Sequence, residues 1–166
     1  MSRTRVSEAG AERIDELEPL WAALHSHHSK IGESVAPRRE LADSWRRRRA
    51  QYERWLVTGE AQLLIAERDG EAVGYAVLRV EQGPATWDVG ERVAELESLA
   101  VLASARGQGV GTMLVAAARE QARSRAATRM SVGVAHSNAD ALRFYAREGF
   151  EPFYVQLLDR GGAAAR

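Results

Sequence analysis

The chain has 166 residues, no cysteine, and 23 basic residues that balance 23 acidic ones. This length fits one domain with a sizeable core, and the missing cysteines exclude disulfides, thiolate metal sites and a cysteine nucleophile. Zero net charge gives no overall field toward nucleic acid or a membrane. With no apolar run of eighteen residues and no signal-peptide pattern, we expect a cytoplasmic protein without a membrane span.

The first sixty residues predict a short strand and two helices. Residues 3–7 are a candidate first strand, and Asp15 with Glu18 is a candidate capping pair for the helix that follows. Residues 29–36, which are polar and contain a glycine, predict a loop. The helical spacing on either side of this loop is carried by Leu17, Leu20, Trp21, Leu24 and His28, and then by Leu41, Trp45, Tyr52, Trp55 and Leu56.

Two charged motifs in this half suggest binding sites at first sight. The run from Arg46 to Arg49 lies between apolar positions of the second helix, which predicts a solvated outer face rather than a nucleic-acid patch. His25 and His28 share one side of a helix with His27 nearby, but no acidic residue completes a known metal-ligand spacing. We therefore predict no metal site, and favour a role for these histidines beside a substrate loop.

The middle of the chain predicts a sheet. Residues 62–66 and 72–80 are strands joined by an Asp69-Gly70 turn. A long connection with an exposed Trp87 leads to a third strand at 93–101. A helix from Val110 then crosses to a strand at 129–135. Three antiparallel strands, a crossover helix and one further strand predict a mixed sheet with helices on its faces.

The C-terminal part predicts one more helix and one more strand. Ser137 and Asp140 form a candidate capping box, and Gly149 suits the left-handed position after the helix, with Phe150 as its apolar contact. A last strand is expected near 153–158. We expect residues 161–166 to be a disordered tail.

A glycine-rich stretch connects the third strand to the crossover helix. It reads Arg106, Gly107, Gln108, Gly109, Val110, Gly111 and Thr112. A helix start presents backbone N–H groups without internal partners, and glycines let an anion approach them closely. The spacing fits neither a Walker loop nor a dinucleotide fingerprint. We interpret the stretch as a phosphate cradle, the alternative being a simple connecting turn.

This stretch resembles the Arg/Gln-x-x-Gly-x-Gly/Ala signature of the GNAT superfamily of N-acetyltransferases, with Arg106, Gly109 and Gly111 at its fixed positions. A second pattern of that family, Asn-x-x-Ala-x-x-Phe/Leu-Tyr-x-x-x-Gly-Phe, is matched from Asn138 to Phe150. The resemblance implies an α/β (α+β) fold over a single domain at 1–160. Its central sheet would be mixed and mostly antiparallel, with a splayed strand pair and helices on both faces.

The resemblance also implies acetyl-CoA as co-substrate and assigns its contacts. The stretch 106–112 would hold the pyrophosphate. Leu99, Ala100 and Val101 would carry a bulge and bond the pantetheine through their backbone, in a slot between the strands of Leu99 and Val132. Asn138 would touch the pantetheine or pyrophosphate. Tyr145 would point at the sulfur as proton donor, the alternative being a packing aromatic.

Acetyl transfer needs a neutral amine, and a carboxylate can remove the ammonium proton. Glu95 and Glu97 lie two apart on one strand and therefore share a face. We favour Glu95 as the base, because the resemblance places Glu97 closer to the cofactor's backbone contacts. A strand N–H near Leu99 to Val101 could stabilise the oxyanion.

Taken together, these features predict an N-acetyltransferase that acts on a primary amine, most simply of a small molecule. The alternatives are a protein or peptide acetyltransferase and a CoA-binding module without catalysis. Family analogy places the acceptor wall at about 26–36 and 83–92, which include His27, His28, Glu33, Trp87 and Asp88. The same analogy suggests a homodimer. Neither nucleic acid nor membrane is expected as a partner.

Overall fold

The computed structural model describes residues 3–30 and 36–159; the tail predicted at 161–166 lies outside these ranges. Within them, no helix is long and apolar enough to cross a membrane. The strands are β1 (Arg5–Ala9), β2 (Ala61–Arg68), β3 (Glu71–Gln82), β4 (Arg92–Val101) and β5 (Arg129–Val132). The helices are α1 (Glu18–Lys30), α2 (Leu41–Val57), α3 (Val110–Ser124) and α4 (Ala139–Arg147), with short 3-10 helices η1 (Ala11–Leu17) and η2 (Ala103–Ala105).

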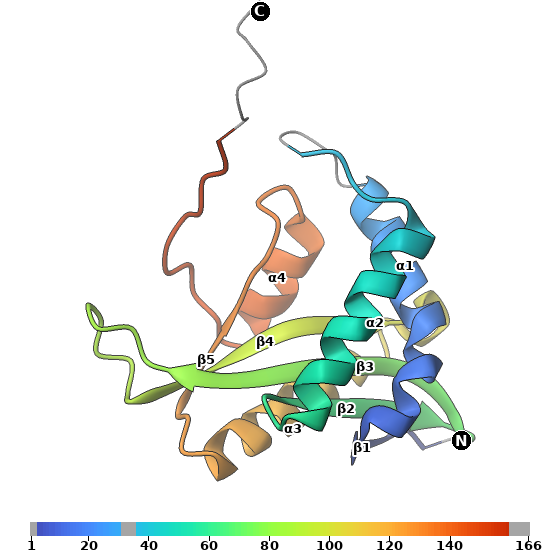
Figure 1. The fold of residues 1–166 in the computed structure, drawn as a ribbon, viewed down its shortest axis with the longest axis horizontal. Coiled ribbons are helices and arrows are strands. Elements are labelled where there is room, and N and C mark those ends of the chain that lie inside the picture. Colours follow the sequence, from blue (N-terminus) through green and yellow to red (C-terminus); the bar gives the residue numbers. More distant parts are fainter. Residues whose placement is uncertain (1–2, 31–35, 160–166) are drawn as a thin grey trace, which may run out of the picture.

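The five strands form one mixed sheet in the order β1-β2-β3-β4-β5 (Figure 1). The first three pairings are antiparallel, and β4 pairs with β5 in parallel across the α3 crossover. Asp69 and Gly70, which both have positive φ, make the tight turn between β2 and β3. The predicted mixed and mostly antiparallel sheet is confirmed.

Strand alternation sends side chains to two separate cores. Leu63, Ile65, Tyr75 and Val77 pack with η1, α1 and α2 on one face of the sheet. Their neighbours Leu64, Ala66, Ala76 and Leu78 pack with α3 on the other face. Because both faces are covered, β2 and β3 read as continuous apolar runs rather than as alternating ones.

Both N-terminal helices occur, with three corrections. Asp15 lies within η1 and pairs with Arg49 at 2.7 Å instead of capping α1. Leu41 is 41% exposed because it is the first residue of α2, whereas Trp45, Tyr52 and Trp55 are buried as predicted. The third correction concerns the arginine run: three of its members lie on the outer face, but Arg48 points inward to Glu97.

The C-terminal elements differ from the prediction at two points. β5 ends at Val132 rather than at residue 135, because its ladder with β4 stops there. The strand predicted at 153–158 is absent from the described chain: residues 151–159 pair with no strand, and their side chains are exposed. High β-propensity alone did not make a strand here, since a strand needs a neighbour for its backbone.

Candidate active site

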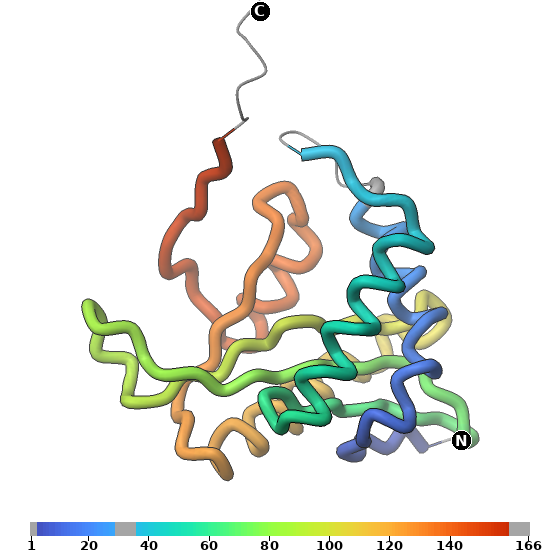
Figure 2. Tube along the Cα trace, in the orientation of Figure 1, coloured from blue at the N-terminus to red at the C-terminus, as the bar shows by residue number. Residues whose placement is uncertain are grey.

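The strand pair β4–β5 opens in the middle of the sheet. The two strands pair from Val93 with Arg129 as far as Leu96 with Val132, and then separate. Figure 2 shows the chain after β5 rising away from β4 towards α4. Residues 98–101 are therefore paired with β3 on one side, and within the described chain residues 97–101 have no strand partner on the side of β5. This leaves a row of donors and acceptors for a ligand.

A β-bulge lies where the strands part. Opposite the neighbours Val77 and Leu78 of β3 stand Ser98 and Leu96, so Glu97 is the extra residue. The bulge was expected at Leu99 to Val101 and is two residues earlier. An extra residue breaks the alternation of side chains, and both Glu97 and Ser98 consequently contact α2.

The two carboxylates predicted as candidate bases have different surroundings. Glu95 lies between Ala94 and Leu96, which face α3, and Glu97 contacts Arg48 of α2, so the two carboxylates share the face opposite α3, as expected. Burial raises the pKa of Glu95, and the nearby charges of Glu97 and Glu81 raise this pKa further, against a lowering by Arg79. The carboxylate of Glu97 accepts a hydrogen bond from Arg48 Nη1 at 2.6 Å. The pKa of Glu95 is thus shifted in the direction that favours a general base.

Helix α2 contacts both bulge residues through side chains one turn apart. Arg48 binds Glu97, while the hydroxyl of Tyr52 donates to Ser98 Oγ at 2.6 Å and lies 3.3 Å from the hydroxyl of Tyr75. Sequence reasoning missed these contacts. The i, i+4 spacing of Arg48 and Tyr52 was readable as one helix face, but nothing in the sequence showed which strand residues that face would meet.

The start of α3 has the geometry of an anion cradle. Gly107 and Gly109 have φ of 70° and 79°, a conformation that glycine adopts without strain. Gly109 is the N-cap of α3, and the first helical bond runs from Met113 N to Gly109 O. The preceding N–H groups of the first turn have no intrahelical partner. The space that a side chain at Gly107 or Gly109 would enter is open, with no atom within 4 Å of either ideal Cβ.

The side chains of this loop are mostly engaged within the protein. Gln108 accepts from Arg68 at 2.7 Å and donates to Ser104 O at 2.8 Å. Thr112 donates to Glu148 at 2.6 Å. The side chain of Val110 is buried in the core. What the loop offers an anion is therefore its backbone, together with the exposed Arg106, whose Nε donates to Val101 O at 3.1 Å.

Gly111 has a different role from the other two glycines. An ideal Cβ at this position would lie 3.1 Å from Phe144 Cζ and 3.2 Å from Phe144 Cε2. The absence of a side chain at Gly111 therefore allows Phe144 of α4 to pack closely on α3. Through this contact, the start of α3 packs against the helix that carries Tyr145.

Helix α4 presents Tyr145 within an aromatic cluster. Its ring lies 5.0 Å from that of Phe144 and 5.3 Å from that of Phe150, both edge-to-face. Burial raises the pKa of Tyr145 to about 12. A thiol ordinarily has a pKa of about 8.5, so full proton transfer from this phenol to a thiolate is uphill by about 5 kcal/mol. This cost favours donation of a hydrogen bond by Tyr145 over the full proton transfer that the resemblance implied.

Asn138 caps α4, a role that the sequence assigned to Ser137 and Asp140. Its side-chain oxygen accepts from Ala141 N at 3.1 Å, and the residue is buried. The end of the helix follows the prediction: Phe150 N donates to Tyr145 O and Gly149 N to Ala146 O, with φ of 83° at Gly149. The predicted contact between Asn138 and the cofactor would therefore compete with this cap at the side-chain oxygen, whereas the amide NH₂ group takes no part in the cap.

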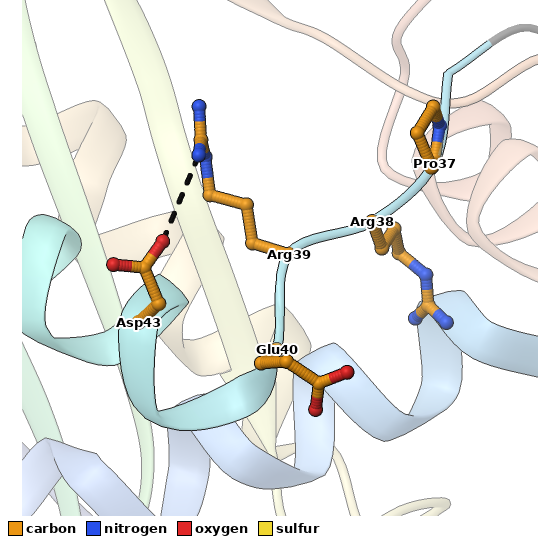
Figure 3. A pocket seen from close by; sticks show the side chains of 5 residues that line it. All are labelled: Pro37, Arg38, Arg39, Glu40 and Asp43. Carbon is orange, nitrogen blue, oxygen red and sulfur yellow. Dashed lines mark ion pairs between the residues drawn. The ribbon is translucent and has the colours of Figure 1, made fainter.

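The predicted acceptor wall is described only in part, since residues 31–35, including Glu33, lie outside the described ranges. His25 Nε2 lies 2.9 Å from Arg39 O, and burial lowers the pKa of His28. Among the described residues, no cluster of three or more His, Asp or Glu could hold a metal ion. Residues directly after the undescribed range 31–35 line a shallow hollow, in which Arg39 Nη1 lies 3.6 Å from Asp43 Oδ2 (Figure 3). Its lining residues are Pro37, Arg38, Arg39, Glu40 and Asp43.

Several known proteins share sequence with this chain. An aminoalkylphosphonate N-acetyltransferase of Salmonella typhimurium is 36% identical over 95 residues, which are 56% of this chain and 58% of that protein. A mycothiol acetyltransferase of Acidothermus cellulolyticus is 33% identical over 108 residues, or 60% of this chain and 33% of the other. The chain thus spans less than two thirds of the length of these curated relatives.

Solved structures share its fold. The aminoglycoside N-acetyltransferase AAC(6')-Iy in complex with CoA superposes with a TM-score of 0.74 at 18% identity, over 98% of this chain and 97% of the other. A GCN5-related N-acetyltransferase from Ralstonia eutropha gives a TM-score of 0.76 at 16% identity, over 95% and 98%. The sequence model of the acetyltransferase (GNAT) family matches residues 21–150. The chain belongs to the GNAT family of acetyltransferases.

Proposed function

We propose that this protein is an acetyl-CoA-dependent N-acetyltransferase that acts on the primary amine of a small molecule. The observation that carries the proposal is the arrangement along β4. Along the chain, residues 97–101, whose backbone has no partner on the side of β5, lie between the half-buried Glu95 and the glycines that start α3. β4 thus carries the candidate base, Glu95, and leads to the candidate phosphate site at the start of α3, at the place where β4 and β5 separate.

The residues present fit the co-substrate. The N–H groups at the start of α3 and the guanidinium of Arg106 would bind the pyrophosphate. The free backbone edge of Leu99, Ala100 and Val101 would bond the pantetheine amides as an added strand does. When bound, acetyl-CoA supplies a thioester whose carbonyl carbon is the electrophile. A strand N–H of residues 99–101 would donate to the carbonyl oxygen as it gains charge.

Glu95 would accept a proton from the incoming ammonium group, because an alkylamine with a pKa near 10.4 is protonated at neutral pH. The amine nitrogen then forms a bond to the carbonyl carbon, and the bond from carbon to sulfur breaks. Of the two protons that nitrogen loses, the first leaves through Glu95 to water and the second ends on the sulfur of CoA. Tyr145 would donate a hydrogen bond to that sulfur as its charge develops.

The small-molecule assignment is supported by the names of relatives, which include an aminoalkylphosphonate and an aminoglycoside N-acetyltransferase. A ribosomal-protein-alanine N-acetyltransferase from Brucella melitensis shares the fold with a TM-score of 0.68 at 19% identity. A peptide acceptor is therefore the second candidate, followed by CoA binding without catalysis.

Purified protein incubated with acetyl-CoA and a panel of amines, with release of thiol followed over time, tests the proposal. The panel should contain aminoalkylphosphonates, amino-sugars and peptides with free N-termini. We expect thiol release with at least one small amine and none with its N-methylated quaternary analogue. Release with peptides alone would favour the second candidate. Thermal stabilisation by CoA without any release of thiol would indicate a CoA-binding module that does not catalyse transfer.

A further inference from the structure

Four side chains connect α2 to the bulge of β4, and we refer to them as the bulge clamp: Arg48, Tyr52, Glu97 and Ser98. Arg48 and Tyr52 lie one helical turn apart and reach Glu97 and Ser98 at 2.6 Å each. The guanidinium of Arg48 also lies over the rings of Trp21 and Tyr52, 4.9 Å and 5.4 Å from their centres. The side chains of Arg48 and Glu97 are only 25% and 19% exposed.

The guanidinium of Arg48 contacts Glu97, Trp21 and Tyr52, whereas its neighbour Arg46 in the arginine run pairs on the helix surface. Arg46 has a side chain that is 74% exposed and pairs with Asp43 on its own helix. Such an exposed pair contributes little to stability. An ion pair that is largely removed from water is different, since loss of one partner leaves an uncompensated charge in a poorly solvated place. For Arg48, the charge left behind would be that of Glu97.

Glu97 is the nearest carboxylate to the candidate base along the strand. The charges that reach Glu95 come from Glu97 on β4 and from Glu81 and Arg79 on β3. β5 places the uncharged Ser131 opposite Glu95. Arg79 is itself engaged, pairing with Glu81 at 2.8 Å and stacking over Trp55 at 4.4 Å. Of the described side chains around Glu95, Arg48 is thus the cation that compensates Glu97.

We propose that Arg48 is a positioning residue for acetyl transfer: by pairing with Glu97 and holding the bulge together with Tyr52, it leaves Glu95 as the carboxylate that takes the acceptor's proton. This inference rests on the proposed function. Without Arg48, the uncompensated charge of Glu97 would oppose ionisation of Glu95. The base would then be protonated, and inactive, at pH values where the wild type works.

Carboxyl ¹³C NMR of protein labelled in its glutamates measures the titration of Glu95 without requiring turnover, with Glu95→Gln to assign the signal. In Arg48→Met we expect the Glu95 midpoint to rise by roughly half to one pH unit. The acid limb of kcat/KM should move by the same amount. In Arg48→Lys, which retains the charge, the Glu95 midpoint should shift less. Arg46→Met is the matched control, in which we expect no shift of this midpoint.

The double variant Arg48→Met/Glu97→Gln separates charge from packing. Because it removes the carboxylate that Arg48 compensated, the Glu95 midpoint should return to the wild-type value or below it. Glu97→Gln alone should also lower the midpoint, which tests the charge argument even if Arg48→Met does not fold. Equal midpoints in wild type, Arg48→Met and Glu97→Gln would overturn the inference. Absence of acetyl transfer by the wild type would instead overturn the proposed function, since the titration needs no substrate.

Discussion

At Glu95, burial and the charges of two nearby carboxylates outweigh the opposing charge of Arg79. Its pKa is raised above the ordinary 4.5 by burial and by two nearby carboxylates. A base works only when deprotonated, so activity should be present above this raised pKa and should fall as the pH drops through it. The acid limb of kcat/KM for the wild type should therefore lie above pH 4.5.

Replacing Glu95 with Gln should retain acetyl-CoA binding and abolish most activity at neutral pH. Partial recovery is expected as the pH rises, because free amine then accumulates without a base. Glu97→Gln should be milder, since that carboxylate is held by Arg48. A pH–rate profile of both variants measures this. A Glu95→Gln profile equal to the wild type, with collapse in Glu97→Gln, would show that the two roles are reversed.

Tyr145 combines a packing ring with a hydroxyl that is proposed to act on the sulfur. Tyr145→Phe keeps the ring contacts to Phe144 and Phe150, so the melting temperature and the affinity for acetyl-CoA should barely change. The turnover number should fall by roughly 10²- to 10³-fold, as for loss of a hydrogen-bond donor to a charge that develops in the transition state. Steady-state kinetics and thermal unfolding test the two parts separately. Turnover within about threefold of the wild type would make Tyr145 a packing residue only.

At the scale of elements, the function of α3 depends on how it begins. Gly109→Asp should abolish the thermal stabilisation that acetyl-CoA gives the wild type, because a carboxylate would stand where an anion should bind. The variant also carries backbone strain, since φ is 79° at this position. The measurement is thermal unfolding with and without acetyl-CoA.

Gly59→Asp is the matched control for that strain. Gly59 also has a positive φ, 75°, and open space around its ideal Cβ, but it follows α2 rather than opening α3. The control should be destabilised by a similar amount and still be stabilised by acetyl-CoA. An equal response of both variants to the ligand would remove the cradle from the proposed mechanism.

At the scale of the molecule, the apolar side chains of residues 153–158 are exposed to solvent within the described chain. Within residues 151–159, Tyr154, Val155 and Leu157 are 78%, 83% and 89% exposed, and Phe153 contacts the exposed Trp87 at 5.6 Å between ring centres. Exposed apolar residues in a row are typical of an interface. We expect the predicted homodimer to use this surface.

We expect light scattering after size-exclusion chromatography to give the mass of two chains for the wild type. The triple variant Val155→Ser, Leu157→Ser and Leu158→Ser should give the mass of one chain and an unchanged melting temperature, because these side chains are exposed. Val57→Ser is the control, since Val57 is equally exposed but lies on α2. A wild-type mass of one chain across the accessible concentrations would contradict the prediction.

The sequence by itself determined the elements and the local geometry of the motifs. Helical periodicity located α2 and α3, because burial on one face of a helix imposes a spacing on its residues. β2 and β3 were recognised instead as apolar runs on either side of the Asp69-Gly70 turn. The left-handed conformation of Gly149 was also readable, since a positive φ after the end of a helix selects glycine. Features that depend only on residues close together in the chain can therefore be recognised from the sequence.

Only the tertiary structure decided which side chains meet. The position of the bulge at Glu97 depends on the register between β3 and β4, and shifting it from the expected Leu99–Val101 changes which residues face α2. Arg48 was assigned to solvent because the arginine run lies between the apolar positions Trp45 and Tyr52, yet Arg48 contacts a strand residue 49 positions away in sequence. The predicted strand at 153–158 failed for the same reason: strand formation, like the pairing of Arg48 with Glu97, depends on a partner that is distant in the chain.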